Sequence, residues 1–130
     1  MKIRINKLRV KKDKRGWLVE ILHESNLDKR EFGQIFVTIA YPGIVKGGHY
    51  HKRKKEWFYV VTGEGELIVV DNKTGEEKKI LMGENNMVAV EIPPNVTHWI
   101  KNIGEEIMHL LVYADEEFNP QRPDTYYLGK

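Results

Sequence analysis

Three of the five histidines in this sequence stand where they could bind a metal ion together with a glutamate. His49 and His51 are separated by one residue, so in an extended strand both side chains point to the same face. Glu56 follows after a short loop, and His98 lies far along the chain. Such a pair by itself is more often two surface or hydrogen-bonded histidines. With the carboxylate and the third imidazole, it makes a ligand set for one divalent transition metal with open coordination positions.

Short strands must position these four side chains. Segments rich in β-branched and aromatic residues, separated by turn residues, fill most of the chain and predict an all-β sandwich or barrel with little or no helix. Residues 63–65 and 102–106 are predicted to be hairpin turns, residues 72–75 another turn, and residues 26–31 at most one helical turn. The predicted strands are residues 18–23, 34–41, 56–62, 66–71, 77–81, 87–92, 97–102 and 107–113.

Length and composition limit the classes of protein that fit. A chain of 130 residues suits one domain. We expect residues 1–130 to form that domain, with a core over about residues 15–115 and an extension over residues 116–130 that wraps along the outside. The sequence has no cysteine, which excludes disulfides and thiolate metal sites.

The charge pattern gives no sign of nucleic acid or membrane as a partner. There are 21 basic and 19 acidic residues, without the strong basic excess typical of nucleic-acid binding. No apolar run approaches the roughly 20 residues that cross a bilayer. The first residues are too polar for a signal peptide, so we expect a cytoplasmic protein.

The ligand pattern resembles the two motifs of the cupin family. The second motif carries Asn95 where the family usually has glycine, and asparagine tolerates the left-handed backbone of such a turn. The resemblance implies a cupin jelly-roll barrel, also called a double-stranded β-helix, and implies His49, His51, Glu56 and His98 as the metal ligands. The matching residues are Gly43, His49, His51, Glu56 and Gly63 in the first motif, and Gly83, Pro93, His98 and Asn102 in the second.

Residues 15–20, 47–51 and 118–126 resemble cupins that act on nucleotide-linked 4-keto sugars. The pattern is most similar to the zinc-holding cupin domain fused to a capsular-polysaccharide reductase, which inverts C3 of a UDP-linked 4-keto-6-deoxy sugar. That resemblance favours zinc, although the same ligands also suit Mn, Fe, Ni or Co. The dTDP-4-keto-rhamnose 3,5-epimerases have lysine at the place of Glu56 and a tyrosine acid near Phe118, and the 3,4-ketoisomerases lack the glutamate. Glu56 therefore argues against the ketoisomerase assignment, and Glu56 and Phe118 together argue against the metal-free mechanism of the 3,5-epimerases.

Other residues are candidates for catalysis or substrate binding, although each could also have a purely structural role. His49, His109, Tyr59 and Tyr113 are candidate acids or bases, although the last three are also typical packing residues. Cations near the motif could bind a diphosphate, or they could be solvated loop charges. These are Lys46, Arg53, Lys55 and Lys101.

The resulting prediction is a metal-dependent epimerase or isomerase of a nucleotide-diphosphate keto sugar in surface-polysaccharide synthesis. Deprotonation next to the ketone would be assisted by a divalent ion acting as a Lewis acid. The alternatives are a metal-dependent cupin of other chemistry, such as a dioxygenase or a small-sugar isomerase, and a non-catalytic sugar-binding cupin. We also expect a homodimer formed through edge strands, with Trp57, Tyr59 and Trp99 as exposed aromatic contacts.

Overall fold

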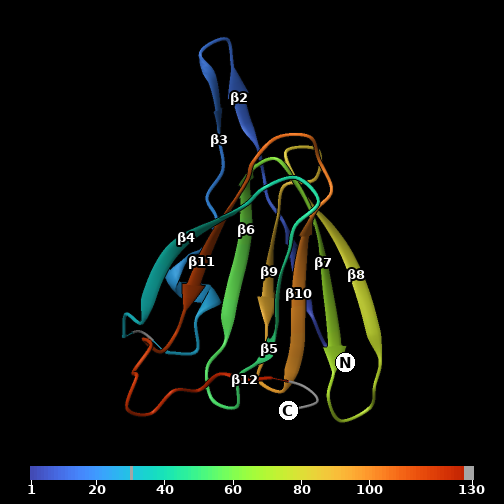
Figure 1. The fold of residues 1–130 in the computed structure, drawn as a ribbon. Coiled ribbons are helices and arrows are strands. Elements are labelled where there is room, and N and C mark those ends of the chain that lie inside the picture. Colours follow the sequence, from blue (N-terminus) through green and yellow to red (C-terminus); the bar gives the residue numbers. More distant parts are fainter. Residues whose placement is uncertain (30, 128–130) are drawn as a thin grey trace.

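The computed structural model describes residues 1–29 and 31–127, and it consists almost entirely of antiparallel strands (Figure 1). A single short 3-10 turn, η1 (Glu24–Asn26), is the one helical element of the described residues. One five-stranded sheet has the order β1 (Arg4–Lys7), β9 (Val88–Ile92), β6 (Glu56–Thr62), β11 (Met108–Ala114) and β4 (Gln34–Ala40). The other has the order β12 (Tyr126–Tyr127), β5 (Val45–Tyr50), β10 (Val96–Asn102), β7 (Glu64–Asp71) and β8 (Glu77–Gly83). A separate hairpin joins β2 (Lys11–Asp13) and β3 (Gly16–Leu18).

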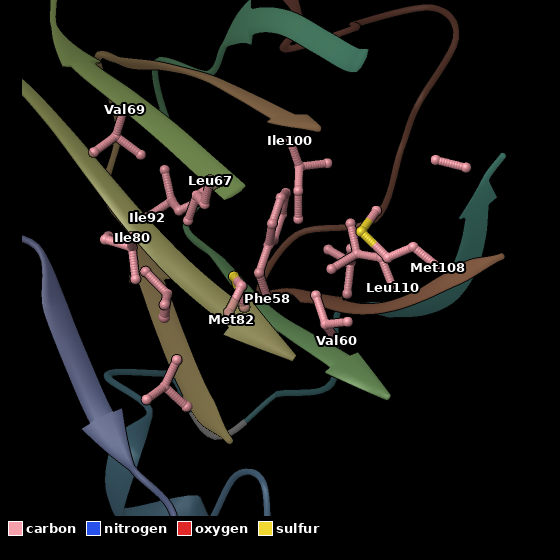
Figure 2. Close-up of a cluster of buried hydrophobic side chains, with 14 of the residues drawn as sticks. Phe58, Val60, Leu67, Val69, Ile80, Met82, Ile92, Ile100, Met108 and Leu110 are labelled. Carbon is pink, nitrogen blue, oxygen red and sulfur yellow. The ribbon is translucent and has the colours of Figure 1, made fainter. Parts of the chain in front are cut away.

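A buried apolar cluster fills the space between the two sheets (Figure 2). Phe58 and Val60 from β6 meet Leu67 and Val69 from β7, and Val60, Leu67 and Val69 are at most 1% exposed. Alternate residues of each strand point inward, so the period-2 pattern of the sequence supplies both inner faces. Burying each such side chain contributes about 1.5–3 kcal/mol. The all-β jelly roll is therefore confirmed, and no helix within the described ranges is long and apolar enough to cross a membrane.

Two of the predicted turns are real turns but do not make hairpins. β6 pairs with β9 and β11, whereas β7 pairs with β8 and β10, so the turn at Gly63 carries the chain from one sheet to the other. Gly63 has a φ of 92°, and a Cβ there would meet the Met108 Cα at 3.0 Å. The segment from Asn102 to β11 crosses between the sheets in the same way. Only the predicted turn at residues 72–75 joins paired neighbours, β7 and β8.

The N-terminal region differs from its predicted strand. Of the predicted residues 18–23, only Leu18 is extended and paired, in the hairpin β2–β3, which projects from the barrel (Figure 1). Residues 19–23 form no strand, so the prediction for residues 18–23 is wrong beyond Leu18. The helical turn lies earlier than predicted because the Asn26 side chain accepts a hydrogen bond from the His23 backbone N–H at 2.7 Å. Residue 30 of the predicted turn lies outside the described residues.

The aromatic side chains predicted to be exposed dimer contacts are mostly buried within the chain. Trp57 and Tyr59 are each 3% exposed. Trp57 packs on Tyr113 with ring centroids 5.6 Å apart, and Phe32 covers Tyr113 at 5.7 Å. The segment before β4 therefore covers the outer face of this sheet. Alternation along β6 indicated that Trp57 points away from the ligand face, but it could not show that Tyr113 of the same chain packs on it.

Candidate metal centre

The four predicted ligands converge at one place between the two sheets. His49 lies on β5 and His98 on β10, both in the second sheet, whereas Glu56 opens β6 in the first sheet and His51 follows β5 directly. One ligand atom from each of the four lies within 4.8 Å of every other. His51, Glu56 and His98 are buried, and His49 is half-buried. The positions of these side chains agree with the predicted ligand set.

A β-bulge in β5 places His49 directly opposite His98. In the pairing of β5 with β10, His49 faces His98 but Gly47 faces Trp99, so the register shifts at Gly48. Gly47 and Gly48 have φ values of 107° and 89°, a region that residues with a Cβ rarely adopt. A Cβ on Gly48 would also meet Trp99 Nε1 at 2.8 Å. The glycine pair is therefore what allows the two imidazoles to meet.

Backbone carbonyls orient two of the imidazole rings. His51 Nδ1 donates to the carbonyl oxygen of Asp124 at 2.7 Å, and His98 Nδ1 donates to that of Val96 at 3.0 Å. A neutral ring that donates through Nδ1 presents the lone pair of Nε2, which is the form that binds metal ions.

The two Nε2 atoms face one carboxylate oxygen. Glu56 Oε1 lies 2.9 Å from His51 Nε2 and 3.3 Å from His98 Nε2, and the latter nitrogen is buried with no hydrogen-bond partner. Lone pairs and a carboxylate oxygen at these distances repel each other unless a proton or a cation lies between them. The donor set and its unsatisfied nitrogen therefore fit a divalent metal ion such as zinc.

The surroundings adjust the charges of the ligands. Burial, followed by the charges of His98 and His51, lowers the pKa of His49 to about 4, and the nearby Lys54 acts in the same direction. Burial by itself raises the pKa of Glu56, but the interactions with His51 and His98 outweigh it and hold that pKa well below its usual range. His49 is thus neutral and Glu56 ionised at neutral pH, as metal ligands must be.

Two cavities adjoin the cluster and share His49, Glu56 and Phe36 in their walls. One, of about 200 Å³, is mostly apolar and extends into the barrel. We call it the apolar cavity. The other, of about 260 Å³, is bordered by polar and charged groups, and we call it the polar cavity; its walls are Gln34, Phe36, His49, His51, Lys54, Glu56, Phe118, Thr125 and Tyr127.

Of the four cations predicted to bind a diphosphate, the structure brings one to a cavity wall. Lys46 borders the apolar cavity, and its ammonium contacts the Thr38 hydroxyl. The Arg53 guanidinium donates to Glu116 at 2.8 Å, and the Lys55 ammonium pairs with Asp28. Lys101 is exposed on β10 and borders neither cavity. Nearness in sequence could not reveal these local ion pairs.

Three of the predicted acid–base residues lie away from the cluster. Met108, Leu110 and Val112 of β11 border the apolar cavity, so the alternate residues His109 and Tyr113 point to the outer face. The His109 ring contacts the Thr62 hydroxyl at 2.7 Å. The Tyr113 hydroxyl accepts from the Gly33 N–H at 3.0 Å. Tyr59 alternates in the same way with Phe58 and lies buried outside both cavities.

The sequence predicted that the C-terminal extension wraps along the outside, and in the structure it also contacts the cluster. β12 pairs with β5 so that Tyr127 faces His49, and their rings meet edge-on at 6.0 Å. Asp124, at 3% exposure, accepts hydrogen bonds from the backbone N–H groups of Lys52, Arg53 and Lys54 at 2.9–3.1 Å. Residues 128–130 lie outside the described part. Asp124, Tyr127 and Lys54 were missed by sequence reasoning, although the tail was part of the resemblance.

Comparisons with protein families and with known proteins found several matches. The family model described as "Polysaccharide biosynthesis C-terminal domain" matches residues 11–126. The spore coat polysaccharide biosynthesis protein SpsL of Bacillus subtilis is 29% identical over 94% of this chain and 84% of its own length. The UDP-2-acetamido-2,6-beta-L-arabino-hexul-4-ose reductase of Pseudomonas aeruginosa is 35% identical over 88% of this chain.

This chain is also similar to several solved structures. The capsular polysaccharide assembling protein CapF of Staphylococcus aureus is 34% identical over 93% of this chain, with a TM-score of 0.72. The dTDP sugar isomerase of Desulfovibrio desulfuricans, 18% identical over 96% of this chain and 82% of its own, has a TM-score of 0.86 and shares the fold. This chain spans 34% of the CapF chain and 29% of the Pseudomonas reductase.

Proposed function

This chain belongs to the polysaccharide biosynthesis C-terminal domain family, and from this premise we propose a metal-dependent epimerase or isomerase of a nucleotide-diphosphate keto sugar. The substrate class that we favour is a 4-keto-6-deoxy sugar on the route to a surface polysaccharide, with inversion at C3. Relatives with polysaccharide-synthesis and UDP-sugar names support the pathway and the substrate class.

The observation that carries the proposal is the cluster of His49, His51, Glu56 and His98, whose ligand atoms lie within 4.8 Å of one another. It contains a buried imidazole nitrogen without a hydrogen-bond partner, and it opens onto two cavities. A structural zinc site is closed by four protein ligands and has no need of an adjoining cavity, whereas a catalytic site needs access for a substrate.

The chemistry begins at the carbon next to the ketone. When a base takes the proton from this carbon, the electron pair of the C–H bond forms a C=C bond, and the π electrons of the ketone move onto its oxygen to give an enolate. Return of a proton to the opposite face restores the ketone with the inverted configuration. A divalent ion, when bound, acts as a Lewis acid that stabilises negative charge on an oxygen, an effect worth several kcal/mol.

The protein's own groups hold the ligands and move the proton. Asp124 and Val96 keep the rings of His51 and His98 in orientation through their carbonyl oxygens. His49 was a candidate base as well as a ligand, but one nitrogen cannot serve both roles at once. The Tyr127 phenol, which borders the polar cavity, can return a proton without giving up a ligand bond.

The size of the cavities limits what enters the barrel. Each is smaller than the roughly 300–1,000 Å³ of a cavity that encloses a drug-sized ligand. We therefore expect the keto sugar to enter beside the metal ligands with its diphosphate at the mouth, while the nucleoside lies outside.

The test is deuterium incorporation at the sugar carbon next to the ketone. The protein is incubated in D2O with a UDP-linked 4-keto-6-deoxy sugar, before and after removal of metal by a chelator. Metal-loaded protein should exchange the C3 proton, the stripped protein should lose at least about 100-fold of that rate, and added Zn2+ should restore it.

A pair of variants controls for loss of fold. Glu56→Gln should lower both metal content and exchange, whereas His23→Gln, on the surface beside Glu20, should change neither. Exchange that is undiminished in the metal-free protein, or absent from the metal-loaded protein, would refute the proposal.

A further inference from the structure

Lys54 is a buried cation whose ammonium has no partner in the described part of the chain. Its residue is 6% exposed, yet residues 1–29 and 31–127 provide no ion pair or hydrogen bond to Nζ. Lysine residues are seldom buried to this extent without a partner for the ammonium. The unpaired ammonium, on a side chain that borders a cavity, points to a ligand that is not part of the chain.

The other three cations of the same loop each have an interaction partner within the chain. Lys52 Nζ lies 4.3 Å above the ring of Tyr126, Arg53 pairs with Glu116, and Lys55 pairs with Asp28. Lys54 differs from them because its side chain borders the polar cavity together with His49, His51 and Glu56. A positive charge therefore faces the space into which the metal ligands open.

The position of Lys54 is fixed by the fold. The Asp124 carboxylate accepts backbone N–H groups from Lys52, Arg53 and Lys54 at 3.0, 2.9 and 3.1 Å, so it ties the loop to the C-terminal extension. Asp124 is itself 3% exposed, and its backbone oxygen orients His51. Because three backbone N–H groups bind this buried carboxylate, the loop is rigid. Asp124 therefore fixes the position of both Lys54 and His51.

The charge balance of the polar cavity identifies the class of ligand. Glu56 supplies one negative charge, whereas Lys54 and a divalent ion would together supply three positive charges. A site with a net positive charge attracts an anion.

We propose that Lys54 Nζ donates a hydrogen bond to an oxyanion of the ligand that occupies the polar cavity. The identity of that ligand as a nucleotide keto sugar rests on the proposed function. Its oxyanion has two possible sources, which are the diphosphate and the enolate oxygen that forms when the C–H bond next to the ketone breaks. Lys54 keeps its own protons in both cases.

Three variants of one loop provide the test. Lys54→Met keeps the aliphatic stem and removes the buried charge, and Lys52→Met removes an equal charge that lies on Tyr126 instead. Lys54→Arg keeps the charge and should retain most of the function. Melting curves and metal content verify that each metal-loaded variant is folded. Lys54→Met should melt close to the parent, because within the described residues it breaks no ion pair or hydrogen bond of Nζ.

Two measurements on the metal-loaded proteins distinguish the sources of the oxyanion. Calorimetry gives the affinity for UDP and dTDP, and deuterium incorporation from D2O gives kcat and KM for the keto sugar. If Lys54 binds the diphosphate, Lys54→Met should weaken nucleotide binding about 10- to 100-fold. If it binds the enolate, kcat should fall by a similar factor while nucleotide affinity stays unchanged.

The outcomes separate this proposal from the proposed function. Nucleotide binding that depends on Lys54, without any deuterium exchange in the parent, supports the assignment of Lys54 and overturns the epimerase. Lys54→Met that matches Lys52→Met in both measurements overturns the assignment of Lys54. So does a parent protein that neither binds nucleotide nor exchanges the proton.

Discussion

At the scale of single residues, the site depends on which imidazole nitrogen carries the proton. The carbonyl oxygens of Asp124 and Val96 hold Nδ1–H on His51 and His98, so both Nε2 lone pairs turn toward Glu56. Outer hydrogen bonds of this kind usually fix the ring and raise its basicity as a ligand. The sequence predicted which residues meet, but only the positions of two backbone carbonyls show how they are presented.

The lowered pKa of His49 predicts how the metal-free protein responds to acid. Its pKa is about 4 in the folded protein against an ordinary value of 6.5, so between these values the unfolded chain binds more protons than the folded one. The free energy of unfolding should therefore fall as the pH falls from about 6.5 to about 4, by about 1–2 kcal/mol once the partial exposure of the ring is allowed for.

Urea unfolding of chelated protein at pH 7.0 and about 4.5 measures this effect, and His49→Gln is the matched variant. The difference between the two pH values should shrink in His49→Gln. Glu56, whose pKa is also lowered, does not interfere, because its contribution to stability is lost only below about pH 4.5. An unchanged difference in His49→Gln would show that His49 does not cause the loss.

At the scale of elements, the β-bulge of β5 is what aligns His49 with His98. Gly48 has a φ of 89°, and a Cβ there would meet Trp99 Nε1 at 2.8 Å, whereas Gly75 has a φ of 79° with no atom within 4 Å of its Cβ position. Gly75→Ala should therefore cost only the backbone strain, about 1–2 kcal/mol. Gly48→Ala should cost about 1–3 kcal/mol more from crowding, and it should also weaken metal binding.

Chemical denaturation and a chelator competition with Zn2+ measure the two effects in the same pair of variants. The loss of metal affinity is the sharper result, because Gly75 lies in the turn after β7 and is not a wall of either cavity. Equal stabilities of the two variants, with equal zinc affinity, would mean that the bulge does not position His49.

The same scale shows what the sequence could and could not predict. The cluster of four side chains was predictable because His49, His51 and Glu56 keep a fixed spacing and His98 follows a recognisable turn, in which Asn95 does adopt a φ of 64°. The turn at Gly63 was recognisable as a reversal, but its residues carry no information about which sheet the next strand joins. That information lies in the pairing of β7 with β10, which is distant in sequence.

The polar cavity was predicted least well, and for a similar reason. Lys54 looks like one of several loop lysines, and Asp124 looks like a tail residue. Their importance comes from contacts across about 70 residues of sequence, such as the Lys54 N–H donating to Asp124. Burial of a charged residue is a property of the whole fold, so no local pattern of residues indicates it.

At the scale of the whole molecule, the open edges of the sheets predict where a second copy would bind. β1, at one edge of the first sheet, and β8, at one edge of the second, carry charged side chains that discourage pairing. β4 is an edge strand without a charged residue, and Ile35 and Val37 are 53% and 59% exposed on it. With Trp57 and Tyr59 buried inside the chain, we expect the dimer to form through β4 instead.

Val37→Lys should therefore convert the dimer into a monomer, because it places a charge in the middle of an apolar edge. Leu81→Lys is the matched control, since Leu81 is 57% exposed on the edge strand β8 and its replacement should leave the mass unchanged. Light scattering at several protein concentrations gives the mass of each form. A parent protein with the mass of one chain would contradict the dimer. A Val37→Lys variant that still dimerises would contradict β4 as the contact, because burying an unpaired lysine in a close apolar interface would cost much of the affinity.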